Sequence, residues 1–326
     1  MKAIVIDSPG GAEKLKIGEV LKPEPKENEI LVKVEATALN RADILQREGK
    51  YPPPKGASNI IGLEMAGTIV DVGSNANDWK TGDKVFGLIP GGGYGEYAVI
   101  NKDMAMKIPN SLKSYEATAI PEVFLTAYQA TLWYGKLTKG KSILIHAGAS
   151  GVGTAAIQIA REIGGHIYVT ASDAKQQSCI NLGAEKAINY KTQDFEKEIL
   201  NLTDNKGVDV IIDFIMGPYF QQNINSLSTD GRLVILATLG GGKVENLDMR
   251  KILIKRLTII GSTLRSRSLD YQIKLTNEFK EHSLEKFESG KFKPVIDKIF
   301  DWKDVSEAHK YMEQNKNIGK IVLKIS

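Results

Sequence analysis

Residues 142–153 carry the strongest structural signal in this chain and read Ser142-Ile143-Leu144-Ile145-His146-Ala147-Gly148-Ala149-Ser150-Gly151-Val152-Gly153. An apolar run passes into a glycine-rich turn, after which apolar side chains recur at positions 152, 156, 159 and 163, the spacing of one helix face. A strand, a tight turn and an amphipathic helix in this order are typical of a dinucleotide-binding loop.

The small residues of this turn have a physical purpose. The turn must be tight, the backbone must approach a diphosphate closely, and the start of the helix must present free N–H groups to the anion. Gly148 and Gly153 hold the outer glycine positions of the usual pattern, whereas Ser150 replaces the middle glycine. We expect these three residues to bind a dinucleotide; a glycine turn that binds nothing is the alternative.

The rest of the chain indicates two domains, as expected for 326 residues. Short apolar runs alternate with helix-length segments at 142–146, 167–170, 208–213, 232–237 and 258–260, which indicates βαβ units around a parallel sheet. Residues 1–120 are instead rich in glycine, proline and strand-like runs, and favour a mostly antiparallel β domain. We expect the C-terminal strands at 295–300 and 320–325, with a helix at 305–314 between them, to rejoin that domain. The sequence therefore predicts an α/β protein with domains 1–120 plus 290–326 and 121–289.

Composition excludes several classes of protein. Hydrophobic residues make up 42% and charged residues 25% of the chain, values typical of globular proteins. The 43 basic residues outnumber the 39 acidic ones only slightly and are scattered, which makes nucleic-acid binding improbable. The single cysteine, Cys179, excludes intramolecular disulfides and is interpreted as a core thiol on a helix. No window approaches the roughly 18 apolar residues of a membrane span, and the apolar run at the N-terminus is too short for a signal peptide, so we expect a cytoplasmic location without membrane contact.

The tip of the second strand of the parallel sheet indicates which cofactor binds. NAD enzymes place a carboxylate there that accepts hydrogen bonds from the adenosine ribose and would repel the extra phosphate of NADP. Here the tip reads Val169-Thr170-Ala171-Ser172, and the nearest carboxylate, Asp173, lies in the following loop. Because Ser172 can donate a hydrogen bond to phosphate and Lys175 follows closely, the sequence favours NADPH. Tyr190, after the third strand, either flanks the same adenosine end or only packs there.

A family resemblance rests on several runs taken together. They are Leu39-Asn40-Arg41-Ala42-Asp43, Pro90-Gly91-Gly92-Gly93, Leu144-Ile145-His146-Ala147-Gly148, Leu264-Arg265-Ser266-Arg267 and Asn315-Lys316-Asn317-Ile318-Gly319-Lys320. Over essentially its full length the chain resembles the quinone oxidoreductase, or zeta-crystallin, branch of the medium-chain dehydrogenase/reductase superfamily. Within that branch the runs are similar to those of the tumour-suppressor-inducible quinone oxidoreductases. The resemblance implies a GroES-like β domain plus a Rossmann doubly wound parallel-sheet domain, with the nicotinamide held between them.

The same resemblance predicts that the protein uses no metal. Zinc alcohol dehydrogenases of this superfamily carry a cysteine where Asn40 stands and a histidine where Leu63 stands, and neither replacement is a usual zinc ligand. The glycine loop at 91–95 also leaves no room for a four-cysteine lobe. Glu64 is interpreted as a structural carboxylate.

The resemblance also implies roles for individual residues. Asn40, Asp43 and Tyr51 are expected around the nicotinamide and the substrate, where the Tyr51 hydroxyl could hydrogen-bond a developing oxyanion. For Tyr51 the alternative is a packed loop aromatic, and for Asp43 a structural hydrogen-bonding role is favoured. Cofactor contacts are implied for Thr126, Gly151, Val152, Leu239, Gly240, Leu264, Arg265, Ser266 and Asn317.

The favoured function is hydride transfer from NADPH to a quinone or a similar conjugated carbonyl compound, with the cofactor supplying the chemistry. A quinone becomes aromatic on reduction and takes protons from water, so no strong general acid is required. The runner-up is reduction of the double bond of enals, enones or acyl thioesters, and a crystallin-like or RNA-binding protein is a third alternative. By analogy with the family we expect a homodimer formed through the strand near residues 258–261. The four histidines are expected to be satisfied or exposed rather than catalytic.

Overall fold

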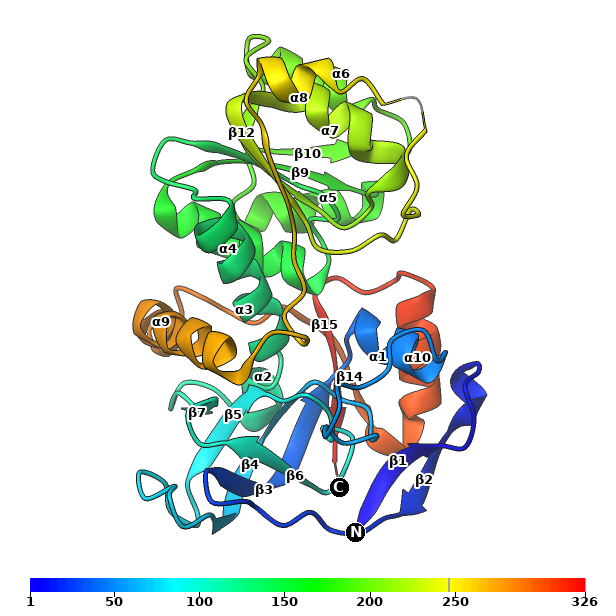
Figure 1. Cartoon of the computed structure of the whole chain (residues 1–326), viewed down its shortest axis with the longest axis vertical. Helices are drawn as coiled ribbons and strands as arrows, with labels where there is room; N and C mark the ends of the chain where they lie inside the picture. The colour runs from blue at the N-terminus through cyan, green and yellow to red at the C-terminus, as the bar shows by residue number, and fades with distance from the viewer. Residues whose placement is uncertain (246, 326) are drawn as a thin grey trace. The chain divides into compact units, whose positions relative to one another are not determined.

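The computed structural model describes residues 1–245 and 247–325. By its internal contacts the chain divides into two compact units, one made of Met1–Leu125 with Arg265–Ser326 and the other of Thr126–Leu264 (Figure 1). The chain thus leaves the first unit once and returns to it, as the sequence predicts.

The second unit is built on a parallel sheet. Its strands are β8 (Ser142–Ile145), β9 (His166–Ala171), β10 (Lys186–Asn189), β11 (Val208–Asp213), β12 (Leu227–Ile235) and β13 (Thr258–Gly261). They lie in the order β10-β9-β8-β11-β12-β13, and every neighbouring pair is parallel. This is the Rossmann strand order, in which the direction of winding reverses between β8 and β11. Ligands of such sheets bind beyond the carboxyl ends of the strands at that reversal.

Helices cover both faces of this sheet. They are α4 (Gly151–Ile163), α5 (Asp173–Leu182), α6 (Phe195–Leu202), α7 (Phe220–Ser226) and α8 (Arg250–Ile254). Figure 1 shows α6, α7 and α8 on one face and α4 and α5 on the other. On the first of these faces Phe195, Ile199 and Phe220 pack with the strand residues Ile188 and Leu233 in one hydrophobic cluster. The predicted doubly wound parallel sheet is confirmed.

The first unit contains a mostly antiparallel seven-stranded sheet. Its strands, with those of a separate hairpin β1-β2, are β1 (Lys2–Ile6), β2 (Leu15–Glu19), β3 (Glu29–Ala38), β4 (Glu64–Val72), β5 (Lys84–Leu88), β6 (Tyr97–Asn101), β7 (Ala105–Lys107), β14 (Ile296–Asp301) and β15 (Lys320–Lys324). The order is β14-β15-β3-β4-β5-β7, with β6 also paired to β3. Because β15 pairs antiparallel with β3, the C-terminal strands do rejoin the N-terminal sheet.

Helices complete the first unit. They are α1 (Arg41–Arg47), α2 (Ser114–Ala117), α9 (Leu269–Glu288) and α10 (Val305–Glu313), together with the first part of α3 (Pro121–Tyr128), whose last residues from Thr126 onward belong to the second unit. The division between the units differs from the predicted one on the C-terminal side, because residues 265–289 belong to the first unit. The reason is aromatic packing: Phe279 and Phe287 of α9 lie against Phe124, with ring centroids 6.4 and 4.9 Å away.

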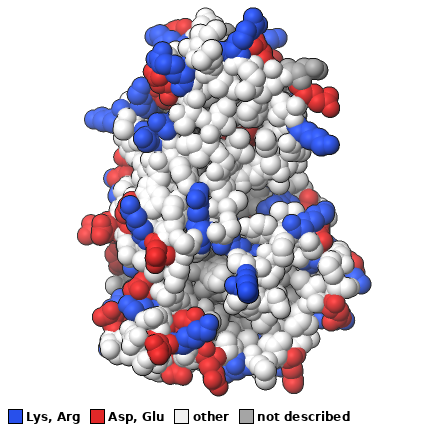
Figure 2. Space-filling model, in the orientation of Figure 1, with Lys and Arg blue, Asp and Glu red and all other residues white. Residues whose placement is uncertain are grey.

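Two surface properties bear on function. Among the described residues, no helix is both long and apolar enough to cross a membrane. On the face shown in Figure 2, acidic and basic side chains are interspersed rather than gathered into one patch of a single sign. This face therefore offers no broad basic surface of the kind that nucleic acids require.

Candidate active site

The predicted dinucleotide loop connects β8 to α4 in the second unit. Ser150 is the N-cap of α4, and its Oγ accepts a hydrogen bond of 3.1 Å from the Gly153 N–H. A Cβ at Gly148 would stand 2.6 Å from Cβ of Val169, and one at Gly153 would stand 2.5 Å from the Ala147 carbonyl oxygen. Both distances are shorter than carbon and oxygen atoms tolerate, so the close packing of loop, strand and helix requires glycine at these two positions.

The N-terminus of α4 can bind an anion. The first N–H groups of a helix have no partner within the helix, and here Ser150 satisfies that of Gly153. No acceptor is found among the described residues for the N–H groups of Gly151 and Val152, which leaves them for a ligand at the positive end of a 13-residue helix. The loop lies at the carboxyl end of β8, where the winding of the sheet reverses, so its residues fit the diphosphate of a dinucleotide.

The residues predicted to choose the cofactor lie together at the neighbouring strand ends. The register pairs Ala171 of β9 with Asn189 of β10, so Ser172 and Tyr190 follow adjacent strand ends. Ser172 is the N-cap of α5, and Lys175 lies in the first turn of that helix. Tyr190 is 45% exposed. Ser172, Lys175 and Tyr190 therefore all follow the carboxyl ends of two adjacent strands.

Four more predicted cofactor residues belong to the second unit. The backbone N–H groups of Leu239 and Gly240 donate to Phe214 and Ile215 at the end of β11, which fixes their loop over the carboxyl edge of the sheet. Leu239 is 54% exposed there, as a residue awaiting a ligand would be. The Oγ1 of Thr126 in α3 is buried and has no hydrogen-bond partner in the part of the chain that the structure describes. Leu264, in contrast, is a buried apolar side chain.

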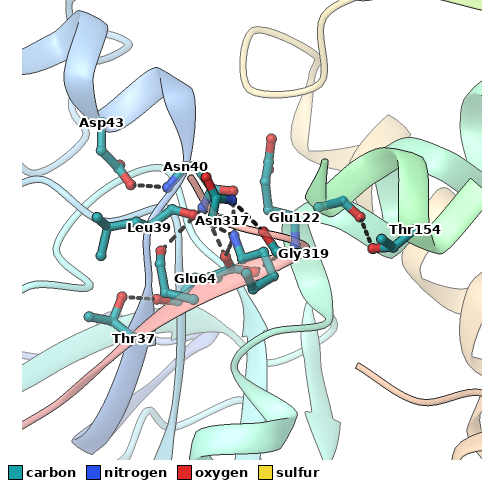
Figure 3. Close-up of polar contacts among 12 residues, drawn as sticks. Thr37, Leu39, Asn40, Asp43, Glu64, Glu122, Thr154, Asn317 and Gly319 are labelled. Atoms are coloured by element: carbon teal, nitrogen blue, oxygen red, sulfur yellow. Dashed lines mark hydrogen bonds and ion pairs between the residues drawn. The ribbon is translucent and has the colours of Figure 1, made fainter. Parts of the chain in front are cut away.

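In the first unit, a buried ion pair holds Asn40, one of the predicted catalytic residues (Figure 3). The Lys320 ammonium donates to Glu64 Oε1 at 2.7 Å, to Asn40 Oδ1 at 2.6 Å and to the Leu39 carbonyl at 2.7 Å. Asn40 Nδ2 donates to the same Glu64 oxygen at 2.8 Å. The other oxygen, Glu64 Oε2, accepts from the backbone N–H of Glu122 at 2.9 Å. Glu64 is therefore the structural carboxylate that the sequence predicts, and both ends of the Asn40 amide are engaged inside this cluster.

Asp43 belongs to α1, where it forms the helix N-terminal capping box with Asn40. Its Oδ2 accepts from the Asn40 N–H at 2.7 Å and from the Tyr94 hydroxyl at 3.3 Å, whereas Oδ1 is buried without a partner among the described residues. Burial, with a smaller contribution from nearby Glu64, raises the pKa of Asp43 to about 7, against the opposing effects of the Asn40 N–H and Lys320. The structural role favoured for Asp43 is thus evident, and its carboxyl also titrates near neutrality.

A chain of buried polar groups leads away from Asp43. The Tyr94 hydroxyl lies 3.2 Å from His309 Nε2, and His309 Nδ1 lies 3.3 Å from Nη1 of the buried Arg47, which also pairs with Glu313. Burial, and then the Arg47 charge, lower the pKa of His309 to about 3, so this imidazole is neutral. Since arginine only donates, Nδ1 must accept and Nε2–H must donate to Tyr94. The chain thereby aims the Tyr94 O–H at Asp43.

Tyr51 and Arg265 form a separate pair in the same unit. The Arg265 guanidinium lies 5.3 Å from the centroid of the Tyr51 ring and donates to the Pro90 carbonyl at 2.7 and 3.0 Å and to Gln46 at 2.8 Å. Burial raises the pKa of Tyr51, so its hydroxyl stays protonated and donates hydrogen bonds. Arg265 therefore holds the Tyr51 loop in addition to the predicted cofactor contact. Asn317 donates to the Gly319 carbonyl at 2.7 Å (Figure 3), and neighbouring Ser266 lies in this unit as well.

The histidines and the cysteine behave as predicted. His146 is buried between Thr170 and Asn223, at 3.1 and 2.7 Å. His166 pairs with Glu185 at the surface. Cys179 is a buried thiol on α5. None of these groups adds a nucleophile to the site.

Sequence reasoning did not find three members of the site. Lys320 and Glu122 look like solvated charges in the sequence, and the His309 chain joins residues more than 200 positions apart. For Lys320 the sequence does contain a signal. It is the first residue of an apolar strand and follows Asn317 closely, and a lysine buried there would need a carboxylate partner.

Comparison with known families identifies both units. Residues 26–110 match the alcohol dehydrogenase GroES-like domain, and residues 151–287 match the family described as zinc-binding dehydrogenase. Zinc does not fit this chain, however. Among the described residues no three histidine, cysteine, aspartate or glutamate side chains gather as metal ligands. The ammonium of Lys320 already occupies the cation position beside Glu64.

Individual relatives span the whole chain. Human quinone oxidoreductase is 31% identical over 99% of this chain and 97% of its own length. A phenolphthiocerol/phthiocerol polyketide synthase polypeptide from Mycobacterium tuberculosis is 32% identical over 98% of this chain, which spans only 14% of that much longer protein.

Solved structures agree on the fold. An NAD-dependent alcohol dehydrogenase has a TM-score of 0.89 at 29% identity, covering all of both chains. The CurK enoyl reductase has a TM-score of 0.88 at 29% identity, covering 100% of this chain and 99% of the other. A mycobacterial protein solved with NADPH has a TM-score of 0.89 at 25% identity over the full length of both.

The relatives and the two domain matches settle the family, while the nearer likeness to the tumour-suppressor-inducible group stays a prediction. The chain belongs to the quinone oxidoreductase, or zeta-crystallin-like, branch of the medium-chain dehydrogenase/reductase superfamily, and is an oxidoreductase of a superfamily that uses a nicotinamide cofactor.

Proposed function

We propose that this protein binds NADPH and transfers its hydride to quinones or similar conjugated carbonyl compounds without a metal. The observation that carries the proposal is the Ser150-capped start of α4. Its glycines leave no room for a side chain, and its free N–H groups lie at the carboxyl end of β8. This arrangement fits a dinucleotide diphosphate.

The preference for NADPH over NADH rests on the strand ends. Ser172 and Lys175 supply a hydroxyl and an ammonium beside the partly exposed Tyr190, and Asp173 begins the next helix instead of ending the strand. A serine and a lysine stabilise the extra phosphate of NADPH, whereas a carboxylate at the strand end would repel it. The mycobacterial relative solved with NADPH supports this choice.

Quinones suit the polar groups of the first unit. Reduction makes the ring aromatic and leaves oxyanions that hydrogen-bond donors stabilise. The Tyr51 hydroxyl, protonated and held by Arg265, is such a donor. Asn40 keeps its orientation through Glu64 and Lys320, so its amide can line the site without rearranging.

A second candidate function is reduction of the carbon–carbon double bond of enals, enones or enoyl thioesters. The polyketide synthase and the CurK enoyl reductase favour this alternative by their names and similarity. Both reactions begin with hydride transfer from NADPH, so only a comparison of substrates can distinguish the two functions.

A cofactor titration followed by an acceptor screen tests the proposal. Fluorescence titration is expected to show tighter binding of NADPH than of NADH, and NADPH oxidation is expected with a benzoquinone or naphthoquinone. Turnover of a short enone alone would favour the second function. Lack of affinity for both reduced nucleotides would contradict either one and would leave a crystallin-like or RNA-binding role.

A further inference from the structure

The carboxyl group of Glu122 forms no hydrogen bond and no ion pair with the described residues of the chain. Glu122 lies in the first turn of α3, where its backbone N–H donates to Glu64 Oε2 at 2.9 Å. Its side chain extends away from that contact (Figure 3) and is only partly buried. No hydrogen bond to the carboxyl is found within residues 1–245 and 247–325, so the backbone is anchored while the acid group remains free.

The charges around Glu122 disfavour its ionised form. Glu64 and Asp43 bring two more carboxyls to the same cluster, and the cations facing it are Lys320 and Arg265. Lys320 is already paired with Glu64 at 2.7 Å, and Arg265 is bound to Pro90 and Gln46. Burial, reinforced by Glu64, raises the pKa of Glu122 to about 7. A substantial share of Glu122 therefore keeps its proton at neutral pH.

Asp43 has a similar pKa but cannot deliver a proton as readily. It is 1% exposed, its Oδ2 holds two hydrogen bonds, and its Oδ1 has no accessible surface. Glu122 is partly exposed, and its carboxyl accepts no hydrogen bond from any described residue. Of the two acids, Glu122 is the one that can meet a ligand.

The helix itself connects Glu122 with the proposed cofactor site. Residues four apart on a helix lie on one face, about 6 Å apart at Cβ. Glu122 and Thr126 stand in this relation within α3 (Pro121–Tyr128). The Thr126 hydroxyl is buried without a partner among described residues, as expected of a group awaiting a ligand. Glu122 therefore lies one helical turn from the residue expected to contact the nicotinamide.

We propose that Glu122 supplies the proton that accompanies the hydride, an inference that rests on the proposed function. NADPH, when bound, supplies the hydride and both electrons. The O–H bond of Glu122 breaks and its proton goes to the α-carbon or oxygen of the reduced substrate, after which the carboxylate takes a proton from water. The sum is acceptor plus NADPH plus H⁺ giving reduced acceptor plus NADP⁺.

The consequence differs between the two substrate classes. The oxyanion of a reduced quinone takes a proton from water rapidly, whereas the carbon of a reduced enone requires a positioned acid. Removing Glu122 should therefore slow enone reduction far more than quinone reduction. General acid catalysis typically contributes about 10²- to 10⁴-fold to a rate.

Three variants test the proposal. Glu122→Gln removes the proton but keeps the shape, Glu122→Asp keeps an acid, and Glu285→Gln makes the same chemical change at an exposed position of α9. With an enone at pH 6.5, Glu122→Gln should lose about 100-fold or more in kcat/KM, with unchanged affinity for NADPH. Glu285→Gln should match the wild type, and Glu122→Asp should recover part of the loss.

The pH profile gives a readout that a merely structural role would not move. A proton donor works only while protonated, so kcat/KM of the wild type and of Glu122→Asp should fall as pH rises through about 7, and that of Glu122→Gln should not. Wild-type rates and an unchanged profile in Glu122→Gln would overturn the inference.

Infrared difference spectra separate the two proposals without turnover. Because Asp43 titrates in the same range, the comparison is made in an Asp43→Asn background. A protonated carboxyl band that disappears between pH 6 and 8 should be present in Asp43→Asn and missing in the double variant Asp43→Asn with Glu122→Gln; an identical band in both would overturn the inference. A wild type that shows the band but reduces no acceptor would instead overturn the proposed function.

Discussion

Single residues in the first unit show how a fold can keep carboxyls protonated near neutral pH. Lys320 forms an ion pair with Glu64, and the cluster around this pair also contains the carboxyls of Asp43 and Glu122. The unmatched acids respond by binding protons, which is the usual result when burial and like charge combine. This arrangement has consequences for stability as well as for chemistry.

The first prediction concerns Asp43 and pH. Its pKa is about 7 in the folded state against 3.8 ordinarily, so the folded protein binds a proton that the unfolded chain has lost between these values. Its stabilising contribution is complete below about pH 4 and is lost as pH rises through 7, by about 4 kcal/mol at most. Urea unfolding at pH 5.5 and 8.5 should show a smaller pH dependence for Asp43→Asn than for the wild type.

Asp78→Asn is the control for this prediction. It makes the same change from carboxylate to amide at an exposed position, so its free energy of unfolding should keep the wild-type pH dependence. An equal change in the free energy of unfolding between pH 5.5 and 8.5 in Asp43→Asn and the wild type would contradict the raised pKa of Asp43.

The second prediction concerns Tyr51. Because burial raises its pKa, the phenol orients a substrate oxygen without giving up its proton. One hydrogen bond contributes about 0.5–1.5 kcal/mol, so Tyr51→Phe should lower kcat/KM with a quinone by up to about tenfold. Its pH profile should match that of the wild type. An unchanged kcat/KM would remove the hydroxyl from the mechanism and leave a packed aromatic held by Arg265.

At the scale of elements, periodicity predicted most strands because their residues alternate or are wholly apolar. The run 208–213 coincides with β11, but β12 begins at residue 227 instead of 232, because its first half contains Ser228-Thr229-Asp230-Gly231 and carries no apolar pattern. The ion pair of Glu64 with Lys320 joins residues 256 positions apart. The pattern of neighbouring residues carries no information about such pairs. It could not predict that α9 belongs to the first unit either, because that depends on contacts with the distant Phe124.

The third prediction tests the loop between β8 and α4. A Cβ at Gly153 would lie 2.5 and 2.6 Å from the carbonyl oxygens of Ala147 and Gly148, both backbone atoms that cannot yield cheaply. Gly153→Ala should therefore weaken NADPH binding at least about tenfold and destabilise the fold by roughly 1–3 kcal/mol. NADPH affinity equal to that of the wild type in a folded Gly153→Ala would refute the proposed contact.

For the whole molecule, the edge of the parallel sheet is the place where a second copy can bind. β13 ends the strand order and leaves one side of its backbone without a neighbouring strand among the described residues. Ile259 on this strand is 36% exposed, and Leu253 and Ile254 of the preceding helix are 79% and 72% exposed. Apolar groups beside an open strand edge are characteristic of an interface. We propose that two chains pair through β13.

Sedimentation velocity provides the fourth prediction. The wild type should sediment as a dimer at micromolar concentration, and the double variant Leu253→Lys with Ile254→Lys should shift it to a monomer, because the exposed apolar surface is replaced by charge. A wild type that stays monomeric would contradict pairing through this edge.

Hydride transfer from NADPH can be observed directly by single-turnover absorbance, comparing ordinary NADPH with NADPH deuterated at C4 of the nicotinamide. We predict that one equivalent of a quinone or enone oxidises one equivalent of bound NADPH, and that the deuterated cofactor reacts more slowly. Tight binding of NADPH without oxidation by any such acceptor would contradict the proposed function.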